Sequence, residues 1–320
     1  MKMAVIVDLA GGQLGGAARF RAEVTAYLHR TARADVRAIG ARRQLSPAWM
    51  ATREAAAARV STRVALNNVG FLAPGGERRT LLRNALHFLT AAETAALEPG
   101  MRSAASRQAM IVHTAARRSD VLVAPCTAMA ERIAAVVPEL ANRVVVRMHP
   151  VSASPLPRRR GGSLILCPVL FAPYKHMDER LREWVEMADR SLDESVRMIV
   201  TASPANLPQS LATSPRLHFV GTLGHDELSR LRARSQALYF PTGLESFGFP
   251  LAEARVDGQP VIALDTPQNR EIAGRALCGY AAGDPDSLRH ATEAALAAEI
   301  TPDAAPFDPD AYFDWLLGTD

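Results

Sequence analysis

The chain has 320 residues, of which 48% are hydrophobic and 22% charged, a composition that indicates a globular protein of about two domains and excludes a disordered chain. Its three cysteines, Cys126, Cys167 and Cys278, are far apart and form no CxxC pattern, which argues against a disulfide framework or a structural zinc. The net charge of +4 divides unevenly, because residues 1–150 hold 21 Lys+Arg against 10 Asp+Glu, net +11, and residues 151–320 hold 16 against 23, net −7.

This charge asymmetry has two interpretations. The first half could face an anionic partner, such as a phosphorylated acceptor or an acidic lipid surface, or its arginines, among them Arg33, Arg53 and Arg59, could only solvate helix faces. Nucleic acid is not expected, since aromatic residues make up only 6% and are not interleaved with basic ones. No segment is long and apolar enough to cross a bilayer, and the opening MKMAVIVDLA lacks a signal-peptide cleavage region.

In the first half, apolar strand candidates alternate with helical stretches, which is typical of a parallel, doubly wound α/β sheet. The expected strands are Ala4–Asp8, Val36–Ile39, Val64–Asn67, Thr80–Leu82, Val121–Ala124 and Val144–Met148. A glycine-rich run, Asp8-Leu-Ala-Gly-Gly-Gln-Leu-Gly-Gly, follows the first strand. It contains neither GxGxxG nor GK[ST], so a nicotinamide or ATP site is not indicated, and a turn that needs glycine is an equal explanation.

A segment rich in Pro, Ser, Gly and Arg, at about 149–162, predicts a linker, after which the strand pattern restarts. The expected strands of the second half are Leu164–Cys167, Val196–Thr201, Leu217–Val220, Ala237–Phe240 and Val261–Leu264. We therefore predict a domain over residues 1–151 and another over 152–305. The apolar and aromatic tail, 306–320, is expected to be a helix that crosses back to the first domain, with a surface cap as the alternative.

The most informative stretch is Leu238–Gly258, LYFPTGLESFGFPLAEARVDG. It predicts a buried strand, a loop, and a helix that begins at Pro250 and ends near Gly258. The helix N-terminus suits a phosphate, while Glu245 before it and Glu253, expected in its first turn, could accept hydrogen bonds from vicinal hydroxyls. A nucleotide sugar carries both kinds of group. Alone, the two acids could equally be a solvated loop residue and a dipole-favoured helix acid.

The preceding strand and the Ser-Phe-Gly-Phe-Pro run between the acids make this stretch resemble the donor site of glycosyltransferase family 4. The resemblance implies a GT-B fold, in which two Rossmann-like domains face a central cleft, and a retaining sugar transferase. It implies catalytic roles for Glu245 and Lys175. The donor-binding residues that it implies are Gly15, Gly16, Leu223, Ser246, Phe247, Gly248, Phe249 and Glu253.

Lys175 stands in Pro-Tyr-Lys-His, similar to a Pro-Tyr-Lys-Asn run of the family, and would neutralise charge on the departing diphosphate. A family arginine is expected about five residues earlier, but this chain has Val169, Leu170 and Phe171 there. Either another arginine, with Arg19 as the candidate, replaces it, or catalysis relies on Lys175 and the Gly-Phe backbone.

The histidine that the family has after its fourth strand corresponds here to either Asn84 or His87. Arg19 is a further candidate for the acceptor side. A partly buried polar histidine is the ordinary alternative for His87. Two further polar residues have structural interpretations, since Thr127 and Asp226 are each expected to cap the helix that follows.

The prediction is a metal-independent retaining glycosyltransferase that moves a hexosyl-type sugar from a nucleoside-diphosphate sugar to an acceptor hydroxyl. The acceptor would be a glycan, a lipid-linked or a small molecule, anionic or membrane-associated, and no cofactor or metal is expected. The alternatives are a non-catalytic sugar-nucleotide-binding subunit and a GT-B epimerase or hydrolase. We predict a cytoplasmic protein, with attachment to the inner face of the membrane as an option. Donor base, sugar and oligomeric state stay open.

Overall fold

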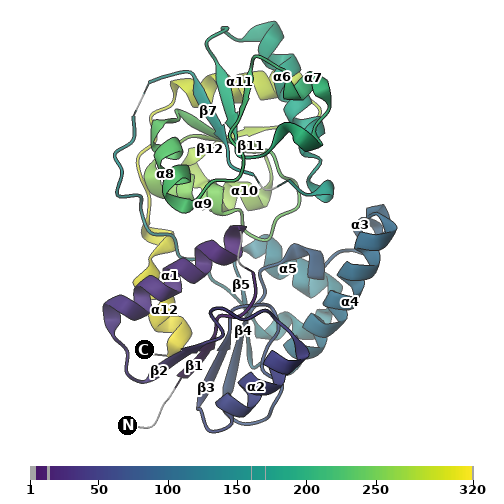
Figure 1. Ribbon diagram of the computed structural model, residues 1–320, viewed down its shortest axis with the longest axis vertical. Coiled ribbons are helices and arrows are strands. Elements are labelled where there is room, and N and C mark those ends of the chain that lie inside the picture. Colours follow the sequence, from purple (N-terminus) through teal and green to yellow (C-terminus); the bar gives the residue numbers. More distant parts are fainter. Residues whose placement is uncertain (1–4, 13–14, 160, 170, 319–320) are drawn as a thin grey trace. The chain divides into compact units, whose positions relative to one another are not determined.

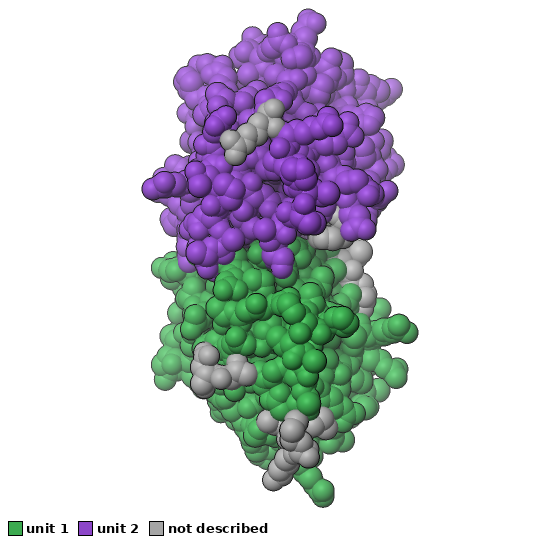
Figure 2. Space-filling view, turned by 90° about the vertical axis from the view of Figure 1, so that its left-hand side faces the viewer, with its two compact units in different colours: residues 1–151, 245–247, 307–320 green, residues 152–244, 248–306 purple. Residues whose placement is uncertain are grey.

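The computed structural model describes residues 5–12, 15–159, 161–169 and 171–318 (Figure 1). The chain folds into two compact units (Figure 2). Unit 1 comprises Met1–Val151, Glu245–Phe247 and Phe307–Asp320, and unit 2 comprises Ser152–Leu244 and Gly248–Pro306.

Unit 1 is built on six parallel strands in the order β2-β1-β3-β4-β5-β6. These strands are β1 Val5–Asp8, β2 Val36–Ile39, β3 Thr62–Ala65, β4 Glu77–Leu81, β5 Val121–Ala124 and β6 Val144–Val146. Its α-helices are α1 Gly15–Thr31, α2 Pro47–Ala57, α3 Ala91–Ala96, α4 Pro99–Ala116, α5 Thr127–Val136 and α12 Pro309–Leu317. The 3-10 turns η1 Ala85–His87 and η2 Pro138–Arg143 also belong to it, and η6 Ala305–Phe307 lies where the chain passes from unit 2 back to unit 1.

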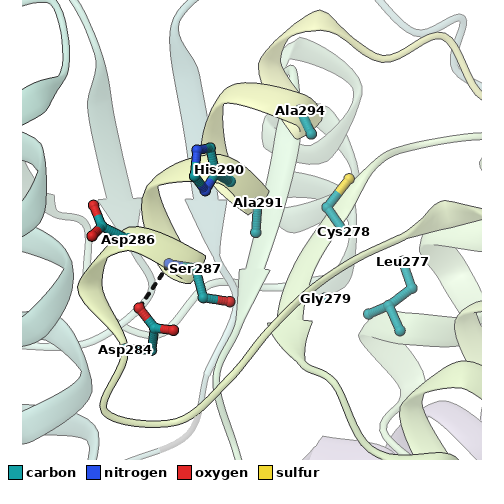
Figure 3. A pocket seen from close by; sticks show the side chains of 9 residues that line it. All are labelled: Leu277, Cys278, Gly279, Asp284, Asp286, Ser287, His290, Ala291 and Ala294. Carbon is teal, nitrogen blue, oxygen red and sulfur yellow. Dashed lines mark hydrogen bonds between the residues drawn. The ribbon is translucent and has the colours of Figure 1, made fainter.

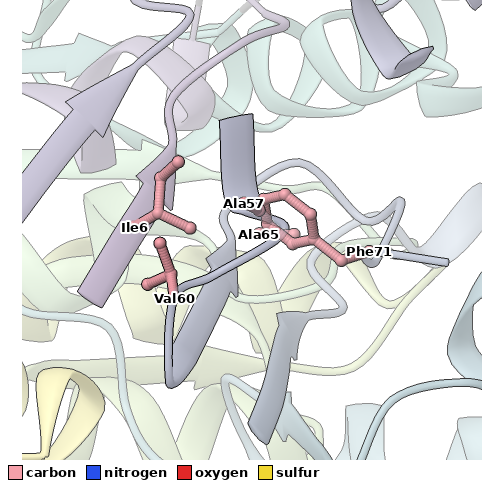
Figure 4. Packing of buried hydrophobic residues seen from close by; sticks show 5 residues of the cluster. All are labelled: Ile6, Ala57, Val60, Ala65 and Phe71. Atoms are coloured by element: carbon pink, nitrogen blue, oxygen red, sulfur yellow. The ribbon is translucent and has the colours of Figure 1, made fainter. Parts of the chain in front are cut away.

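The core of unit 1 forms where apolar strand residues meet the helices. A buried cluster joins β1 and β3 to α2 and the loops around them (Figure 4). Its members are Ile6, Ala57, Val60, Ala65 and Phe71.

The C-terminal helix α12 packs against α1 (Figure 1). The rings of Tyr27 and Phe313 lie 5.2 Å apart, and the Tyr27 hydroxyl donates to Asp314 Oδ1 at 2.5 Å. The last turn of α12 is also bound to the sheet, since Arg79 Nη1 of β4 donates to the carbonyl of Trp315 at 2.6 Å. The end of the chain is therefore part of the core of unit 1.

Unit 2 repeats the architecture with six parallel strands in the order β12-β11-β10-β7-β8-β9. These strands are β7 Leu164–Cys167, β8 Arg197–Val200, β9 Leu217–Phe219, β10 Ala237–Phe240, β11 Val261–Leu264 and β12 Leu277–Tyr280. Its α-helices are α6 Met177–Ser191, α7 Gln209–Ala212, α8 His225–Arg234, α9 Phe249–Asp257, α10 Pro267–Ala273 and α11 Pro285–Ala297. Its 3-10 turns are η3 Pro173–Lys175, η4 Pro204–Asn206 and η5 Gly274–Ala276.

Most of the expected strands are present, and five have the predicted bounds. These are Val36–Ile39, Val121–Ala124, Leu164–Cys167, Ala237–Phe240 and Val261–Leu264. The strand predicted to begin at Val64 begins two residues earlier, as β3. Strand β4 begins at Glu77 rather than at the predicted Thr80, and its start was missed because its first residues are charged. The edge strand β12 was missed, since its sequence, LCGY, is only partly buried and contains glycine. Ala4 lies outside the described residues.

Both predicted helix caps are wrong. Thr127 is the first residue of α5, and Cys126 holds the N-cap position instead. Asp226 lies inside α8, whose N-cap is Gly224, and the Glu227 carboxylate accepts the Gly224 N–H at 3.2 Å. In both cases the N-cap lies one or two residues before the residue that was predicted to cap the helix.

Candidate functional site

In unit 2 the chain order reverses between two neighbouring strands, β7 and β10. From β7 the chain proceeds to β8 and β9 on one side, and from β10 to β11 and β12 on the other. In open α/β sheets, ligands bind beyond the carboxyl ends of the strands at such a switch point. The segments that follow these two strands carry Lys175 and the N-terminus of α9, so two of the predicted elements follow neighbouring strands of unit 2.

Lys175 ends the 3-10 turn η3, which follows β7. Its backbone N–H donates to the carbonyl of Ala172 at 2.9 Å, and the residue is half-buried. Of the 37 basic residues in the chain only Lys2 and Lys175 are lysines, the others being arginines. The segment after β7 therefore carries a lysine in a chain whose other basic residues, apart from Lys2, are arginines. Leu170, near which the family arginine was expected, lies outside the described residues.

The N-terminus of α9 has the geometry of an anion site. Gly248 is its N-cap residue and has φ +83°, and the Leu251 N–H bonds the Gly248 carbonyl at 2.9 Å. Gly248 has no side chain with which to cap this end, and no acid lies in the first turn of the helix, so acids of the first turn do not oppose the positive end of the helix dipole. Phe249 and Pro250 form the first turn, as the sequence predicted within one residue.

Glu253 lies beyond the first turn of α9, which corrects the position predicted from the sequence. It is buried, and its Oε2 lies 2.5 Å from Arg232 Nη1 of α8. Arg232 Nη2 also lies 2.8 Å from Asp257 Oδ2, so a single buried guanidinium holds the two acids of one face of α9. Burial is the largest single contribution and lowers the pKa of Arg232. The attraction of the two acids together outweighs it, so the pKa is raised. No local pattern in the sequence predicts this partner.

The tip of the loop after β10, Glu245–Phe247, belongs to unit 1. The Ser246 hydroxyl donates to the carbonyl of Arg83 at 2.8 Å, and the Cys126 thiol donates to the carbonyl of Ser246 at 3.3 Å. Phe247 is buried, with its ring 5.0 Å from that of His149. The side chains of Ser246 and Phe247 thus anchor the tip, and Glu245 beside them is half-buried.

Among the other donor-side predictions, Gly15 and Gly16 form the exposed first residues of α1, where Gly15 has φ +58°. Arg19, proposed to replace the family arginine, is paired with Glu23 in the same helix at 2.7 Å. Leu223 is half-buried in the loop between β9 and α8 of unit 2.

Asn84 and His87 are held together in unit 1, after β4. Asn84 is the N-cap of η1, its Oδ1 accepts the Leu86 N–H at 3.1 Å, and its Nδ2 lies 3.3 Å from His87 Nε2. Burial lowers the pKa of His87 to about 4, although a hydrogen bond with Gln108 opposes the shift. His113 Nε2 donates to the His87 carbonyl at 2.7 Å. His87 is therefore a neutral, buried residue at neutral pH.

A cavity of about 640 Å³ lies on unit 2 between the edge strand β12 and α11 (Figure 3). Its lining includes Cys278, His290 and Asp286. Burial raises the pKa of the Cys278 thiol to about 11, so it is not a nucleophilic thiolate at neutral pH. Within the described ranges no group of three or more His, Cys, Asp and Glu is arranged to hold a metal ion, and no helix there has the length and apolarity to span a bilayer.

Comparison with known proteins assigns the fold and the class of one domain. Residues 163–298 match the family described as glycosyl transferases group 1. The serotype-specific mannosyltransferase WbdA of Escherichia coli is 35% identical over 82 residues, which are 26% of this chain and 10% of WbdA. The matched part therefore spans about a tenth of that relative.

Two solved structures extend the likeness over more of the chain. WaaG, a glycosyltransferase involved in lipopolysaccharide biosynthesis, superposes with a TM-score of 0.65 at 14% identity, covering 98% of this chain and 100% of WaaG. The pneumococcal O-GlcNAc transferase GtfA, in complex with UDP and GlcNAc, superposes with a TM-score of 0.54 at 14% identity, covering 78% of this chain and 52% of GtfA. The fold is GT-B, as predicted. The segment that matches the family lies largely in unit 2.

Proposed function

We propose that the protein is a retaining glycosyltransferase of family 4 type that transfers a hexosyl-type sugar from a nucleoside-diphosphate sugar to an acceptor hydroxyl. The observation that carries the proposal is the switch point of unit 2, where Lys175 and the N-terminus of α9, which begins at the glycine N-cap Gly248, follow neighbouring strands within the segment that matches group 1 glycosyltransferases. The UDP in the GtfA complex and the mannosyltransferase name of WbdA support a nucleoside-diphosphate sugar as the donor.

In the proposed reaction the bond between the anomeric carbon and the β-phosphate oxygen breaks, and a bond from the acceptor oxygen to the same face of that carbon forms. The acceptor hydroxyl proton passes to the departing phosphate oxygen. The barrier lies in the charge that develops on the leaving diphosphate, which Lys175 and the amide dipoles of α9 would stabilise without a metal. No cofactor is required.

The two glutamates would bind hydroxyl groups of the donor. Glu245 is proposed to hold the sugar and Glu253 the ribose. A carboxylate offers about four acceptor positions, so Glu253 bound to Arg232 through Oε2 retains the capacity for a ribose diol. Arg232 would then act as a positioning residue that fixes the carboxylate before the donor binds.

The decisive experiment is a thermal-shift screen with UDP-, GDP-, ADP- and dTDP-sugars, because a bound donor raises Tm by mass action. The donor that stabilises the protein is then incubated with candidate acceptors, anionic and lipid-linked ones included, while release of nucleoside diphosphate is followed. We expect release that depends on an acceptor. Release of free sugar or of an epimer without an acceptor would indicate a hydrolase or an epimerase. Donor binding without turnover would indicate a sugar-nucleotide-binding subunit. No stabilisation by any donor would refute the proposal.

A further inference from the structure

Arg83 is a buried cation of unit 1 that lacks an anionic partner. It follows β4, and its guanidinium carbon lies 5.1 Å from the ring centroid of Phe20 in α1. Its Nη1 is buried and has no hydrogen-bond acceptor among the described residues. No described carboxylate interacts with it. The titratable groups that act on the pKa of Arg83 are the hydroxyl of Tyr312 and the like charge of Arg21.

The hydroxyl of Tyr312, from α12, is the second unsatisfied group at this place. Tyr312 is buried, and its Oη has no hydrogen-bond partner in the described part of the chain. Its ring lies 5.8 Å from that of Phe20, edge to face. The Phe20 ring therefore lies beside both the Arg83 guanidinium and Tyr312. A phenol hydroxyl can donate to an anion, as a guanidinium can.

The contrast with the other buried arginines of unit 1 makes Arg83 unusual. Arg53 Nη1 lies 2.7 Å from Asp8 Oδ2, and Arg63 Nη1 donates to the carbonyl of Ala73 at 2.7 Å. Taking an ion out of water is costly unless it is paired and hydrogen-bonded. Burial is accordingly the main factor that lowers the pKa of Arg83, to about 10, and Arg21 adds to the effect, so the group is still charged at neutral pH.

We propose that Arg83 and Tyr312 form a phosphate-binding site in unit 1. Arg83 as a whole retains exposed surface, from which an oxyanion could reach its planar fork, and Tyr312 would donate a further hydrogen bond. A phosphate suits these donors better than a carboxylate, because its several oxygens can accept from the guanidinium fork and from the Tyr312 hydroxyl at the same time. The backbone of Arg83 is fixed for this role, because Asn68 Oδ1 accepts its N–H at 2.6 Å and the Ser246 hydroxyl donates to its carbonyl.

The phosphate could belong to the nucleotide of the donor or to a phosphorylated acceptor, and only this choice of carrier rests on the proposed function. The site itself is tested without activity. The probe is inorganic phosphate, with acetate at equal ionic strength as the comparison, and binding is measured by calorimetry and by Tm. The measurements are made in Lys175→Ala protein, so that phosphate bound in unit 2 contributes less.

Arg83→Met should weaken phosphate binding at least tenfold and abolish the rise in Tm, while the Tm without phosphate stays equal or increases, since an unpaired buried charge is removed. Tyr312→Phe should weaken binding about threefold with the fold unchanged, because a single neutral donor is lost. The matched control is Arg117→Met, a half-exposed arginine of unit 1 paired with Glu139, which should leave phosphate binding unchanged.

Phosphate affinity that stays within twofold in both Arg83→Met and Tyr312→Phe would overturn the proposal, and so would acetate binding as tightly as phosphate. If Arg83→Met does not fold, Arg83→Lys decides, because it keeps the charge but loses the fork and should weaken binding at least threefold. In protein with Lys175 intact, weaker binding of the free nucleoside diphosphate in Arg83→Met assigns the phosphate to the donor. Unchanged nucleotide binding together with lost inorganic phosphate binding assigns it to the acceptor.

Discussion

Each sheet reverses its strand order once, after two strands in unit 1 and after three in unit 2, and the side chains at the two reversals differ. In unit 1 the reversal lies between β1 and β3, and the carboxylate of Asp8 at the end of β1 is completely buried there. It accepts four hydrogen bonds from within unit 1: Ala10 N at 3.0 Å, Trp49 Nε1 at 3.2 Å, Arg53 Nη1 at 2.7 Å and Asn67 Nδ2 at 2.9 Å. A carboxylate has about four acceptor positions, so the capacity of Asp8 is used internally.

In unit 2 the equivalent place has a lysine and the N-terminus of α9, which begins at the glycine N-cap Gly248. Both favour a negatively charged ligand, whereas the Asp8–Arg53 pair of unit 1 is already neutral as a pair. The switch point of unit 1 therefore has polar groups that satisfy one another, whereas that of unit 2 has groups that suit an anion. If this comparison is correct, substitutions at the first switch point should affect unfolding, and substitutions at the second should affect turnover.

The largest effect is expected for Asp8→Ala, which leaves Arg53 buried without its anion. Removing one partner of a buried pair costs about 3–5 kcal/mol of unfolding free energy. Urea unfolding measures the loss, and the control is Asp120→Ala, whose partner Arg78 forms a partly exposed pair worth about 1 kcal/mol or less. Equal losses in the two variants would contradict the assignment of Asp8 to the core. The double variant Asp8→Leu, Arg53→Met should recover most of the stability, because no charge is left buried.

Lys175→Ala and Glu245→Gln are expected to lower turnover more than tenfold each while the unfolding free energy stays within about 0.5 kcal/mol of the parent, as for other partly exposed sites. The reason is the loss of electrostatic stabilisation that acts mainly in the transition state, and tenfold corresponds to about 1.4 kcal/mol. Steady-state rates with the donor found by the screen give the measurement. Arg190→Ala, a mostly exposed cation in α6, is the control for non-specific charge loss. A parental rate in either variant would remove that residue from the mechanism.

Gly248→Ala tests the helix start in unit 2 with a smaller effect. A side chain at φ +83° costs about 1–2 kcal/mol, and its Cβ would lie 3.0 Å from Leu251 Cδ1 and 3.1 Å from Phe240 Cε1. We expect lower stability and weaker donor binding, seen by thermal unfolding with and without donor. Gly243→Ala in the same loop is the matched control, because the nearest atom to its Cβ would be 3.8 Å away. Similar behaviour of the two variants would mean that Gly248 does not shape the site.

The sequence allowed the fold and this part of the site to be predicted because the signals are local. Buried strands such as β10 and β11 are continuous apolar runs, and Gly248, Pro250 and Gly258 delimit α9 within one residue. β12 has no such run, and it could be recognised only from its pairing with β11. Local patterns thus predicted the elements, but they did not predict which of them lie at an edge.

Partners that are distant in sequence could not be predicted. From the sequence, Arg232 is expected to be one of several arginines on an exposed helix, but in the structure it binds both Glu253 and Asp257. From the sequence, Arg83 is expected to be a solvated charge beside Asn84. Only the aromatic rings around it and the lack of a nearby carboxylate distinguish it from a solvated arginine. A charged residue has the same appearance in a sequence whether it is paired, solvated or buried without a partner.

The smallest expected effect is a pH dependence of unit 1 stability that arises from His87. Its pKa is about 4 in the folded chain against 6.5 for an ordinary histidine, so between these values the unfolded state binds more protons. The unfolding free energy should therefore decrease as the pH falls from about 6.5 to about 4 and be independent of this group above 6.5. Urea unfolding at pH 5 and pH 7.5 measures the difference. Replacing the ring in His87→Gln should make that difference smaller, whereas His290→Gln, an exposed histidine of unit 2, should leave it unchanged. A pH dependence identical in parent and His87→Gln would show that the ring is solvated, and would place His87 outside the core of unit 1.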